Sequence, residues 1–429
     1  MKISVVGLGY VGLPLFVELT KHYDNVVGYD ISSGRIKELK DGYDRTDEVD
    51  PDRLEVINHN NGKDDCNFLF TENPWDMEWS DIFIVTVPTP IDNYKRPNLQ
   101  PLLHATADIG QLLRKGGLII YESTVFPSCT EDHCVPILSD LSRLKYNEDF
   151  FVGYSPERIN PADKVNTLTT ITKVVSGSNI EATMRVKELY ESLGIKTHVA
   201  PNIKVAEMSK AIENAQRDLN ISFVNEVALF CSKLDIDTND VLDAAGTKWN
   251  FLKFKAGLVG GHCISVDPYY LIQKAEELDM HLSVIASGRR VNDQMPTHVT
   301  STLIKKMIQE RVDVINPRIL VMGITFKENT PDIRNSKVID VVHQLKNEYK
   351  CTVDVYDPHA DDKLLWGKYQ ITSHKKLNEL PNVSYDAIIY AVDHDEFKEF
   401  PFIDFTMHKK RIIYDLKGVL PRSLCKLRL

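Results

Sequence analysis

The segment "VVGLGYVGLP" near the start of the chain restricts its fold more than any other stretch. Gly7, Gly9 and Gly12 follow an apolar run of strand character and open a helical pattern, with the spacing G-x-G-x-x-G. The first glycine makes a tight turn, the second lets a pyrophosphate approach the backbone, and the third lets helix and strand pack closely. The helix N-terminus then favours phosphate charge. The motif predicts a dinucleotide-binding βαβ unit rather than a glycine turn without a ligand.

The next strand-like run, "NVVGYD", ends in Asp30 at the separation expected for an acid that binds ribose hydroxyls. A carboxylate here favours NAD over NADP, because the 2′-phosphate of NADP would meet a like charge. Arg35 stands nearby and could pair with such a phosphate, but we expect it to stack on or edge the adenine. NAD is therefore the expected cofactor.

The first third of the chain alternates short apolar runs with helical patterns, which is typical of βαβ units and a parallel sheet. A long helical pattern runs from about Asn202 to Lys233, and a second α/β series follows it. We therefore predict the class α/β, with two Rossmann-like, doubly wound domains joined by a central helical domain. The expected bounds are 1–200 for the NAD-binding domain, 201–300 for the central domain with the long helix, and 301–429 for the C-terminal domain.

The long helical pattern carries an apolar to small stripe at three- and four-residue spacing. Its members are Val205, Met208, Ile212, Ala215, Leu219 and Ser222. Such a helix separates two domains or forms a dimer contact, and we expect a homodimer through it.

Charge and cysteine content restrict the class of protein. The net charge of −10 argues against nucleic acid as a partner, since neutralising phosphates requires a basic face. The seven cysteines are scattered without a C-x-x-C pair, which indicates reduced thiols in a cytoplasmic protein. Cys129, His133 and Cys134 lack the second cluster that a zinc site needs, so no metal is expected. No apolar run reaches the roughly 18–20 residues that span a bilayer, so no membrane association is expected.

The segment "GLVGGHCISVDPYY" places Cys263 after closely spaced glycines. A lone cysteine is usually a small buried apolar residue. Here Gly260 and Gly261 remove side chains that would block the sulfur, and Asp267 follows four residues later. In a protein that binds a nicotinamide cofactor, a thiolate can add to an aldehyde, and the thiohemiacetal can then give up a hydride. We therefore predict that Cys263 is a nucleophile.

Two further groups of polar residues are candidates for the same chemistry. Lys210 and Asn214 lie at i and i+4 of the long helix, where they form either a solvated face or a pair directed at a developing oxyanion. Thr124 and Glu157 follow strand-like runs, and ligands bind at the carboxyl ends of strands in a doubly wound sheet. Taken alone, a capping or turn role is equally expected for Thr124 and Glu157.

A set of motifs, in order along nearly the whole chain, resembles the nucleotide-sugar 6-dehydrogenases, the family of UDP-glucose and GDP-mannose dehydrogenases. The motifs are "GLGYVGLP", "VPTP", "YESTVFP", "YSPERINP", "KAIENAQRDLNI", "GTKWNFLKF", "GLVGGHC", "FKENTPDIR" and "VDVYDPHA". The resemblance implies two successive NAD-dependent oxidations that convert the C6 alcohol of a UDP-sugar to a carboxylate through a cysteine thioester. It also implies that the C-terminal domain, which keeps only Gly323 of a glycine motif, binds the uridine diphosphate.

The same resemblance implies roles for individual residues. The implied catalytic residues are Cys263, Lys210, Asn214, Asp267, Thr124 and Glu157. The implied NAD-binding residues are Gly7, Gly9, Tyr10, Val11, Gly12, Asp30, Arg35, Thr89, Thr124 and Arg334. The implied substrate-binding residues are Glu157, Arg158, Asn160, Lys210, Asn214, Asn250, Phe251, Gly260 and Lys327.

Within the family, "GTKWNF" and "YDLKGVLP" are similar to the branch that acts on UDP-N-acetylhexosamines. This implies UDP-N-acetylglucosamine as the substrate and surface polysaccharide synthesis as the purpose. UDP-N-acetylgalactosamine, UDP-N-acetylmannosamine and UDP-glucose stay open as alternatives. The chain departs from the UDP-glucose branch at Pro161 and Val266, where that branch has a glutamate and a lysine, so the role of that glutamate is not transferred.

Two other classes of protein stay open. A two-electron dehydrogenase of the hydroxyacid type has a similar domain order, needs no cysteine and makes one NADH per substrate. A non-catalytic nucleotide-binding protein is disfavoured, because we would expect it to have lost one of Lys210, Asn214 and Cys263.

Overall fold

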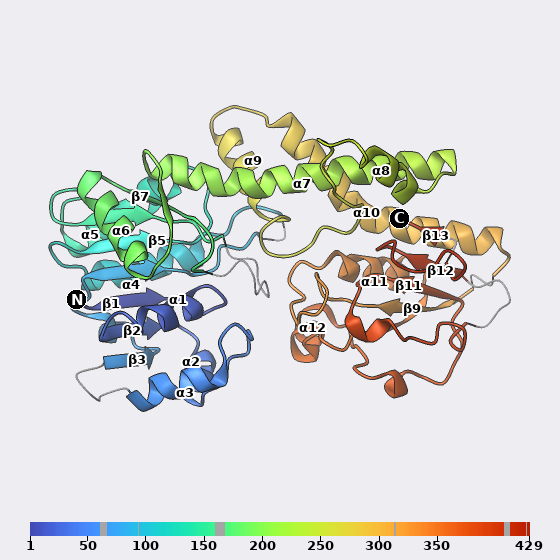
Figure 1. The fold of residues 1–429 in the computed structure, drawn as a ribbon, viewed down its shortest axis with the longest axis horizontal. Helices are drawn as coiled ribbons and strands as arrows, with labels where there is room; N and C mark the ends of the chain where they lie inside the picture. Colours follow the sequence, from blue (N-terminus) through green and yellow to red (C-terminus); the bar gives the residue numbers. More distant parts are fainter. Residues whose placement is uncertain (61–66, 93, 159–167, 313–314, 407–411, 426) are drawn as a thin grey trace. The chain divides into compact units, whose positions relative to one another are not determined.

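The computed structural model describes residues 1–60, 67–92, 94–158, 168–312, 315–406, 412–425 and 427–429. The chain forms two compact units (Figure 1). Unit 1 contains residues 1–213 and 269–280, and unit 2 contains residues 214–268 and 281–429. The helix α7 (Ile203–Leu234) belongs to unit 1 at its start and to unit 2 over the rest of its length. The expected division into three domains stays a prediction.

Unit 1 is built on an eight-stranded sheet with the order β3-β2-β1-β4-β5-β6-β7-β8. Its first six strands follow the order of a dinucleotide-binding Rossmann sheet, which confirms the predicted class for this unit. Neighbouring strands are parallel except for β6 and β7, an antiparallel pair that the alternation of the sequence did not indicate. The strands are β1 (Ile3–Val6), β2 (Asn25–Tyr29), β3 (Asn67–Thr71), β4 (Ile82–Val85), β5 (Leu118–Tyr121), β6 (Phe151–Tyr154), β7 (Lys173–Gly177) and β8 (Thr197–Val199).

Helices join the strands of unit 1 and bury their apolar faces against them. Leu13 and Phe16 of the first helix and Val186 and Leu189 of the sixth belong to the same apolar core as Ile3 and Val5. Two of the helices begin at capping side chains, since Ser32 and Asn179 accept hydrogen bonds from backbone amides of the first turn. The helices are α1 (Gly12–Leu19), α2 (Ser33–Lys40), α3 (Pro51–Asn60), α4 (Gln100–Leu112), α5 (Val135–Ser142), α6 (Ile180–Ser192) and α9 (Asp267–Glu277), with short helices η1 (Pro74–Met77) and η2 (Thr130–Cys134).

The predicted stripe on α7 is only partly buried. Ala215 and Ser222 are buried, whereas Val205, Met208 and Ile212 are all more than 40% exposed. Most of the other buried residues of α7 are small or polar: Ala206, Glu207, Lys210, Ala211, Asp218, Asn225 and Ala228. Ile203, Val224 and Cys231 are buried as well. The first three members of the stripe are therefore exposed, and the role of this helix in a dimer contact stays a prediction.

Unit 2 contains a parallel five-stranded sheet with the order β10-β9-β11-β12-β13. This is the 2-1-3-4-5 order of doubly wound sheets, so the second α/β series is confirmed as well. The strands are β9 (Arg318–Met322), β10 (Thr352–Tyr356), β11 (Ala387–Tyr390), β12 (Ile412–Asp415) and β13 (Leu427–Arg428). The helices are α8 (Thr238–Ala245), α10 (Ser283–Gln309), α11 (Lys337–Asn347) and α12 (Asp362–Tyr369), with short helices η3 (Leu377–Glu379) and η4 (Asp395–Phe397).

The two faces of the unit 2 sheet pack against different partners. Ile319 and Val321 of β9 belong to one core with residues of α10 and α11. Leu320, between them, belongs to a second core rich in aromatic side chains, such as Phe397 and Phe400. This alternation follows from the two-residue period of a strand. Along the described part of the chain, no helix has both the length and the apolar character that crossing a membrane requires.

Candidate active site

The glycine loop of unit 1 has the geometry that its motif predicts. Gly7 has a φ of +95°, and a Cβ atom on Gly12 would lie 1.8 Å from the Gly7 carbonyl oxygen, so a side chain fits at neither position. No atom lies within 4 Å of the Cβ position of Gly9. The space beside Gly9, together with the start of α1, fits the pyrophosphate of a dinucleotide.

Asp30, directly after β2, and Arg35, on α2, both bind the backbone of the glycine loop. Asp30 Oδ2 accepts a hydrogen bond of 2.9 Å from the backbone amide of Leu8, while Arg35 Nε donates to the Leu8 carbonyl oxygen at 2.8 Å. The Arg35 guanidinium is buried and also pairs with Asp44 at 2.8 Å. Burial raises the pKa of Asp44, but hydrogen bonds from Thr46 and Arg35 outweigh it and lower the pKa. These contacts differ from the expected place of Arg35 at the adenine, which stays a prediction.

The loops after β4 and β5 meet through two predicted residues. Thr89 Oγ1 donates to the Thr124 carbonyl oxygen at 2.7 Å, and the Tyr270 hydroxyl donates to the Thr89 carbonyl oxygen at 2.8 Å. The carboxyl ends of neighbouring parallel strands lie at one edge of the sheet, where nucleotide ligands bind. Arg334, also predicted for NAD, lies in unit 2, where its guanidinium pairs with Asp332 at 2.5 Å.

Glu157 and Arg158 follow β6. Glu157 is buried, and its backbone amide donates to the Glu122 carbonyl oxygen at 3.4 Å. Arg158 binds both carboxylate oxygens of Glu213 on α7, at 2.6 and 3.2 Å, and thereby connects the β6 loop to the long helix. Asn160, another predicted substrate residue, lies outside the described residues.

A buried ion pair next to Glu157 escaped the sequence analysis. Lys173, the first residue of β7, lies 2.8 Å from Glu122, and both side chains are at most 2% exposed. The Tyr190 hydroxyl donates to the second oxygen of Glu122. Burial is the main cause that raises the pKa of Glu122, Lys173 opposes it, and the charge of Glu157 raises it further. In the sequence, the one indication of a buried ion pair was a lysine as the first residue of a strand that continues with two valines.

The helix α7 carries Lys210 and Asn214 one turn apart. Lys210 is buried, and Asn214 Nδ2 donates to Asp267 Oδ2 at 2.5 Å. Asp267, also buried, begins α9, and its backbone amide donates to the Cys263 carbonyl oxygen at 2.8 Å. Of the six cysteines in the described part of the chain, five are buried and Cys263 alone is partly exposed. The structure therefore brings together Asn214, Asp267 and the backbone of Cys263.

The glycines before Cys263 are needed for close packing. A Cβ atom on Gly260 would lie 2.7 Å from the Asn335 carbonyl oxygen. Gly261 has a φ of +89°, and its Cβ position lies 3.1 Å from the ring of Phe326. The sequence suggested that these glycines clear the approach to the sulfur. In unit 2 they instead let the segment pack directly on residues 326–336, while Gly257 has no atom within 4 Å of its Cβ position.

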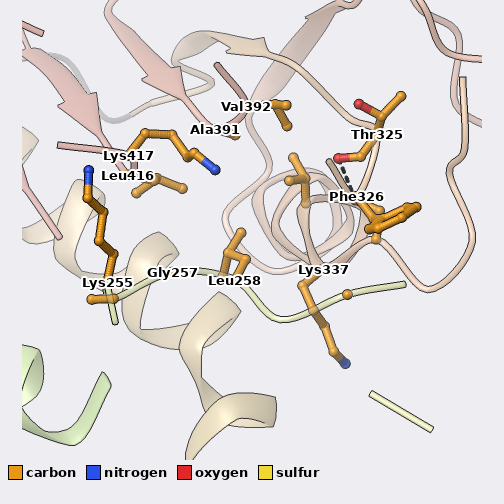
Figure 2. A pocket seen from close by; sticks show the side chains of 14 residues that line it. Lys255, Gly257, Leu258, Thr325, Phe326, Lys337, Ala391, Val392, Leu416 and Lys417 are labelled. Carbon is orange, nitrogen blue, oxygen red and sulfur yellow. Dashed lines mark hydrogen bonds between the residues drawn. The ribbon is translucent and has the colours of Figure 1, made fainter. Parts of the chain in front are cut away.

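Unit 2 contains a pocket at the carboxyl edge of its sheet (Figure 2). Thr325 and Phe326 line one side, and Lys255 and Lys417 line the opposite side (Figure 2). Lys337 also contributes to the lining, and its ammonium pairs with Asp340 at 3.0 Å. These lysines were missed because no local pattern relates them. They come from three separate segments.

The predicted substrate residues of unit 2 lie at different places around this pocket. Gly260 belongs to its lining, and Lys327 follows the lining residue Phe326. Asn250 and Phe251 lie outside the lining in the described part of the chain; Asn250 is exposed and Phe251 is half-buried.

Comparison with known proteins gives three family matches. Residues 1–194 match the NAD binding domain of the UDP-glucose/GDP-mannose dehydrogenase family, residues 204–294 its central domain, and residues 320–422 its UDP binding domain. The two Rossmann-like sheets and these matches define an NAD-dependent dehydrogenase of nucleotide sugars. The chain belongs to the UDP-glucose/GDP-mannose dehydrogenase family.

Relatives match over the whole length. UDP-N-acetyl-D-glucosamine 6-dehydrogenase of Pseudomonas aeruginosa is 49% identical and that of Salmonella typhi 46%, each over 100% of this chain and 99% of the relative. Among solved structures, UDP-D-ManNAc dehydrogenase of Pyrococcus horikoshii has a TM-score of 0.86 at 29% identity, with 98% of this chain and 96% of that chain covered.

Proposed function

We propose that the protein oxidises C6 of UDP-N-acetyl-D-glucosamine from alcohol to carboxylate, with two NAD⁺ consumed per sugar. The main support is the full-length similarity to two relatives of that name, at 49% and 46% identity. The product, a nucleotide-activated uronic acid, would serve as a precursor for surface polysaccharide.

NAD⁺, when bound, supplies the hydride acceptor for both oxidations. Gly7, Gly9 and Gly12 would hold its pyrophosphate beside the start of α1, and Asp30 would accept hydrogen bonds from the adenosine ribose. The carboxylate of Asp30 already accepts a hydrogen bond from the backbone amide of Leu8. A carboxylate has about four lone-pair sites, so Asp30 can accept from the ribose hydroxyls as well.

Uridine diphosphate would bind the pocket of unit 2. Lys255 and Lys417 line it and supply positive charge for the diphosphate. Most of the lining, with Lys417, lies in the part of the chain that matches the UDP binding domain, whereas Lys255 lies in the part that matches the central domain. Lys417 also lies 3.5 Å from Glu328, so the carboxylate holds the ammonium near the pocket in the absence of phosphate.

In the first oxidation the C6 hydroxyl loses its proton and a hydride leaves C6. Lys210 and Asn214 would stabilise the oxygen as negative charge develops on it. Burial of Lys210 strengthens this effect, because a charge acts more strongly where little water screens it.

In the second oxidation the Cys263 thiolate adds to the C6 aldehyde and forms a thiohemiacetal. Loss of the second hydride leaves a thioester, and water releases the carboxylate and the free thiol. Asp267 and Thr124 would hold that water, and Asn214 fixes the Asp267 carboxylate through the bond of 2.5 Å. Glu157 is proposed as a base or a substrate contact.

The test is the number of NADH molecules formed per UDP-sugar, measured at 340 nm with product analysis by mass spectrometry. The panel contains UDP-N-acetylglucosamine, its galacto and manno epimers, and UDP-glucose. We expect two NADH per UDP-N-acetylglucosamine and the highest kcat/KM for that sugar. One NADH per substrate, with an aldehyde or ketone as product, would contradict the four-electron reaction. A higher kcat/KM for another sugar would correct the substrate alone.

We also propose that the protein is a homodimer through α7. The support is the exposed apolar surface of this helix, where Phe223 is 58% and Phe230 63% exposed. Light scattering should give twice the chain mass of 48.9 kDa for the wild type, and Phe223→Lys with Phe230→Lys should halve it. A wild type with the mass of one chain at micromolar concentration would contradict the dimer.

A further inference from the structure

His394 is a wholly buried side chain that no step of the proposed reaction uses. It follows β11 by four residues, and its ring packs between His359 and Phe397, with centroid separations of 4.8 and 5.1 Å. Nδ1 accepts a hydrogen bond of 3.0 Å from the backbone amide of Asn329. Because Nδ1 is an acceptor, a neutral ring carries its proton on Nε2.

The Nε2 proton is directed at the buried carboxylate of Asp357. Nε2 lies 3.2 Å from Asp357 Oδ2 and 3.2 Å from Thr325 Oγ1. Burial raises the pKa of Asp357, but the bond from His394 and several backbone amides outweigh it and hold the pKa well below its ordinary value. Asp357 is therefore an ionised acceptor, and the imidazole donates to it.

Asp357 also ties two strand ends together. Its Oδ2 accepts the backbone amides of Ile324 and Thr325, after β9, at 2.6 and 3.1 Å. Its Oδ1 accepts the amides of His359 and Ala360, after β10, at 2.9 Å each. With His394 from the segment after β11, one hydrogen-bonded set joins the carboxyl ends of three neighbouring strands.

This set lies directly next to the pocket of unit 2. Thr325 and Phe326 line the pocket, as do Ala391 and Val392, which precede His394 by three and two residues (Figure 2). The side chain of Asn329 makes two further hydrogen bonds, both with Asp395. Asn329 Nδ2 donates to the Asp395 carboxylate at 2.9 Å, and the Asp395 backbone amide donates to Asn329 Oδ1 at 3.0 Å. Segment 325–330 is therefore bound to the segment after β11 at both Thr325 and Asn329.

We propose that His394 is a positioning residue for nucleotide binding: it holds segment 325–330, whose first two residues line the pocket, in the conformation that receives the uridine diphosphate. This inference rests on the proposed function, which places uridine diphosphate in that pocket. Without the imidazole, the Asn329 amide and the buried Asp357 carboxylate each lose a partner, and the segment is free to adopt other conformations.

The experiment measures the Kd for UDP by titration calorimetry on the full-length protein. His394→Phe keeps a ring but makes no hydrogen bond, His394→Asn keeps an acceptor near the position of Nδ1, and His394→Gln reaches the position of Nε2. We expect His394→Phe to raise the Kd for UDP about ten-fold, the loss typical of one buried hydrogen bond. His394→Asn should recover more affinity than His394→Gln, because the Asn329 amide belongs to the segment itself.

Three controls separate this role from a general loss of stability. The KM for NAD⁺ should stay unchanged in all variants, because the glycine loop lies in unit 1. His343→Phe, on α11 of the same unit, should leave the Kd for UDP unchanged. Melting temperatures report any common destabilisation.

The outcomes are distinct. A Kd for UDP that is unchanged in all three His394 variants, with only the melting temperature lowered, would overturn the positioning role. Equal affinities of His394→Asn and His394→Gln would overturn the assignment to the Asn329 amide, even where His394→Phe does not fold. Failure of the wild type to bind UDP would overturn the proposed function together with this inference.

Discussion

Asn214 Nδ2 donates a hydrogen bond of 2.5 Å to Asp267 Oδ2, across 53 positions of sequence. This bond connects the middle of α7 to the first residue of α9. Since the Asp267 amide also donates to the Cys263 carbonyl oxygen, two hydrogen bonds through Asp267 connect Asn214 to the backbone that carries the thiol.

Two variants can separate the effect of this hydrogen bond on kcat from the effect of having the negative charge at position 267. Asp267→Asn should lower kcat by about 100-fold or more, because the carboxylate that we propose to hold the hydrolytic water is lost. The double variant Asn214→Asp with Asp267→Asn keeps an amide–carboxylate bond but moves the charge onto α7. It should restore the melting temperature and leave kcat low. Recovery of kcat in the double variant would show that only the bond matters.

Cys263→Ser keeps the shape of the side chain and loses the soft nucleophile. Uronic-acid formation should fall by several orders of magnitude, because a hydroxyl is barely ionised near neutral pH whereas a free thiol has a pKa of about 8.5. Formation of an aldehyde, or a stalled hemiacetal, is expected from the first oxidation alone. Cys231→Ser, Cys351→Ser and Cys425→Ser are the matched controls, and all three cysteines are buried. Near-normal turnover in Cys263→Ser would remove the thioester from the mechanism.

Asp30 should determine the choice between NAD⁺ and NADP⁺. Asp30→Asn removes the charge that disfavours a 2′-phosphate, so the ratio of kcat/KM for NAD⁺ to that for NADP⁺ should fall about ten-fold or more. The ratio is informative because a loss of active protein affects both cofactors equally. Asp52→Asn, an exposed change on α3, should leave it unchanged. A wild-type ratio near one would contradict the role of Asp30.

Glu207 gives unit 1 a specific dependence of stability on pH. Its carboxylate accepts the backbone amides of Ser128 and Thr130, at 2.5 and 2.9 Å, and burial raises its pKa from 4.5 to about 7. An acid whose pKa is raised on folding binds its proton more tightly in the native state. Its contribution therefore favours folding below pH 4.5 and is lost as pH rises through 7, by about 3 kcal/mol at most.

The measurement is the urea midpoint of wild type and Glu207→Gln between pH 5 and 8. The wild type should lose stability relative to Glu207→Gln as the pH rises, since glutamine does not titrate. Glu226→Gln, an exposed change on the same helix, provides the control. Parallel curves for wild type and Glu207→Gln would mean that Glu207 has an ordinary pKa.

The sequence alone was sufficient for the two α/β series, the long helix between them and the cofactor, although it did not indicate β3, β8 or β13. Gly7, Gly9 and Gly12 act through their own backbone geometry, and the apolar runs indicate strands through a local period, so neither depends on distant partners. The family resemblance likewise rests on motifs in order along the chain, and the domain matches confirm it.

The tertiary structure decided which polar groups meet. Arg35 is close to Asp30 in sequence, yet its guanidinium binds Leu8 and Asp44. Lys173 and Glu122, 51 positions apart, form a buried pair because β7 is added antiparallel beyond β6 in the sheet. Several large apolar residues of α7 are exposed, while Glu207 and Lys210 of the same helix are buried. A local sequence pattern shows whether a side chain is charged or apolar. The partner of that side chain depends on strand order and helix packing, which bring together residues that are far apart in the sequence.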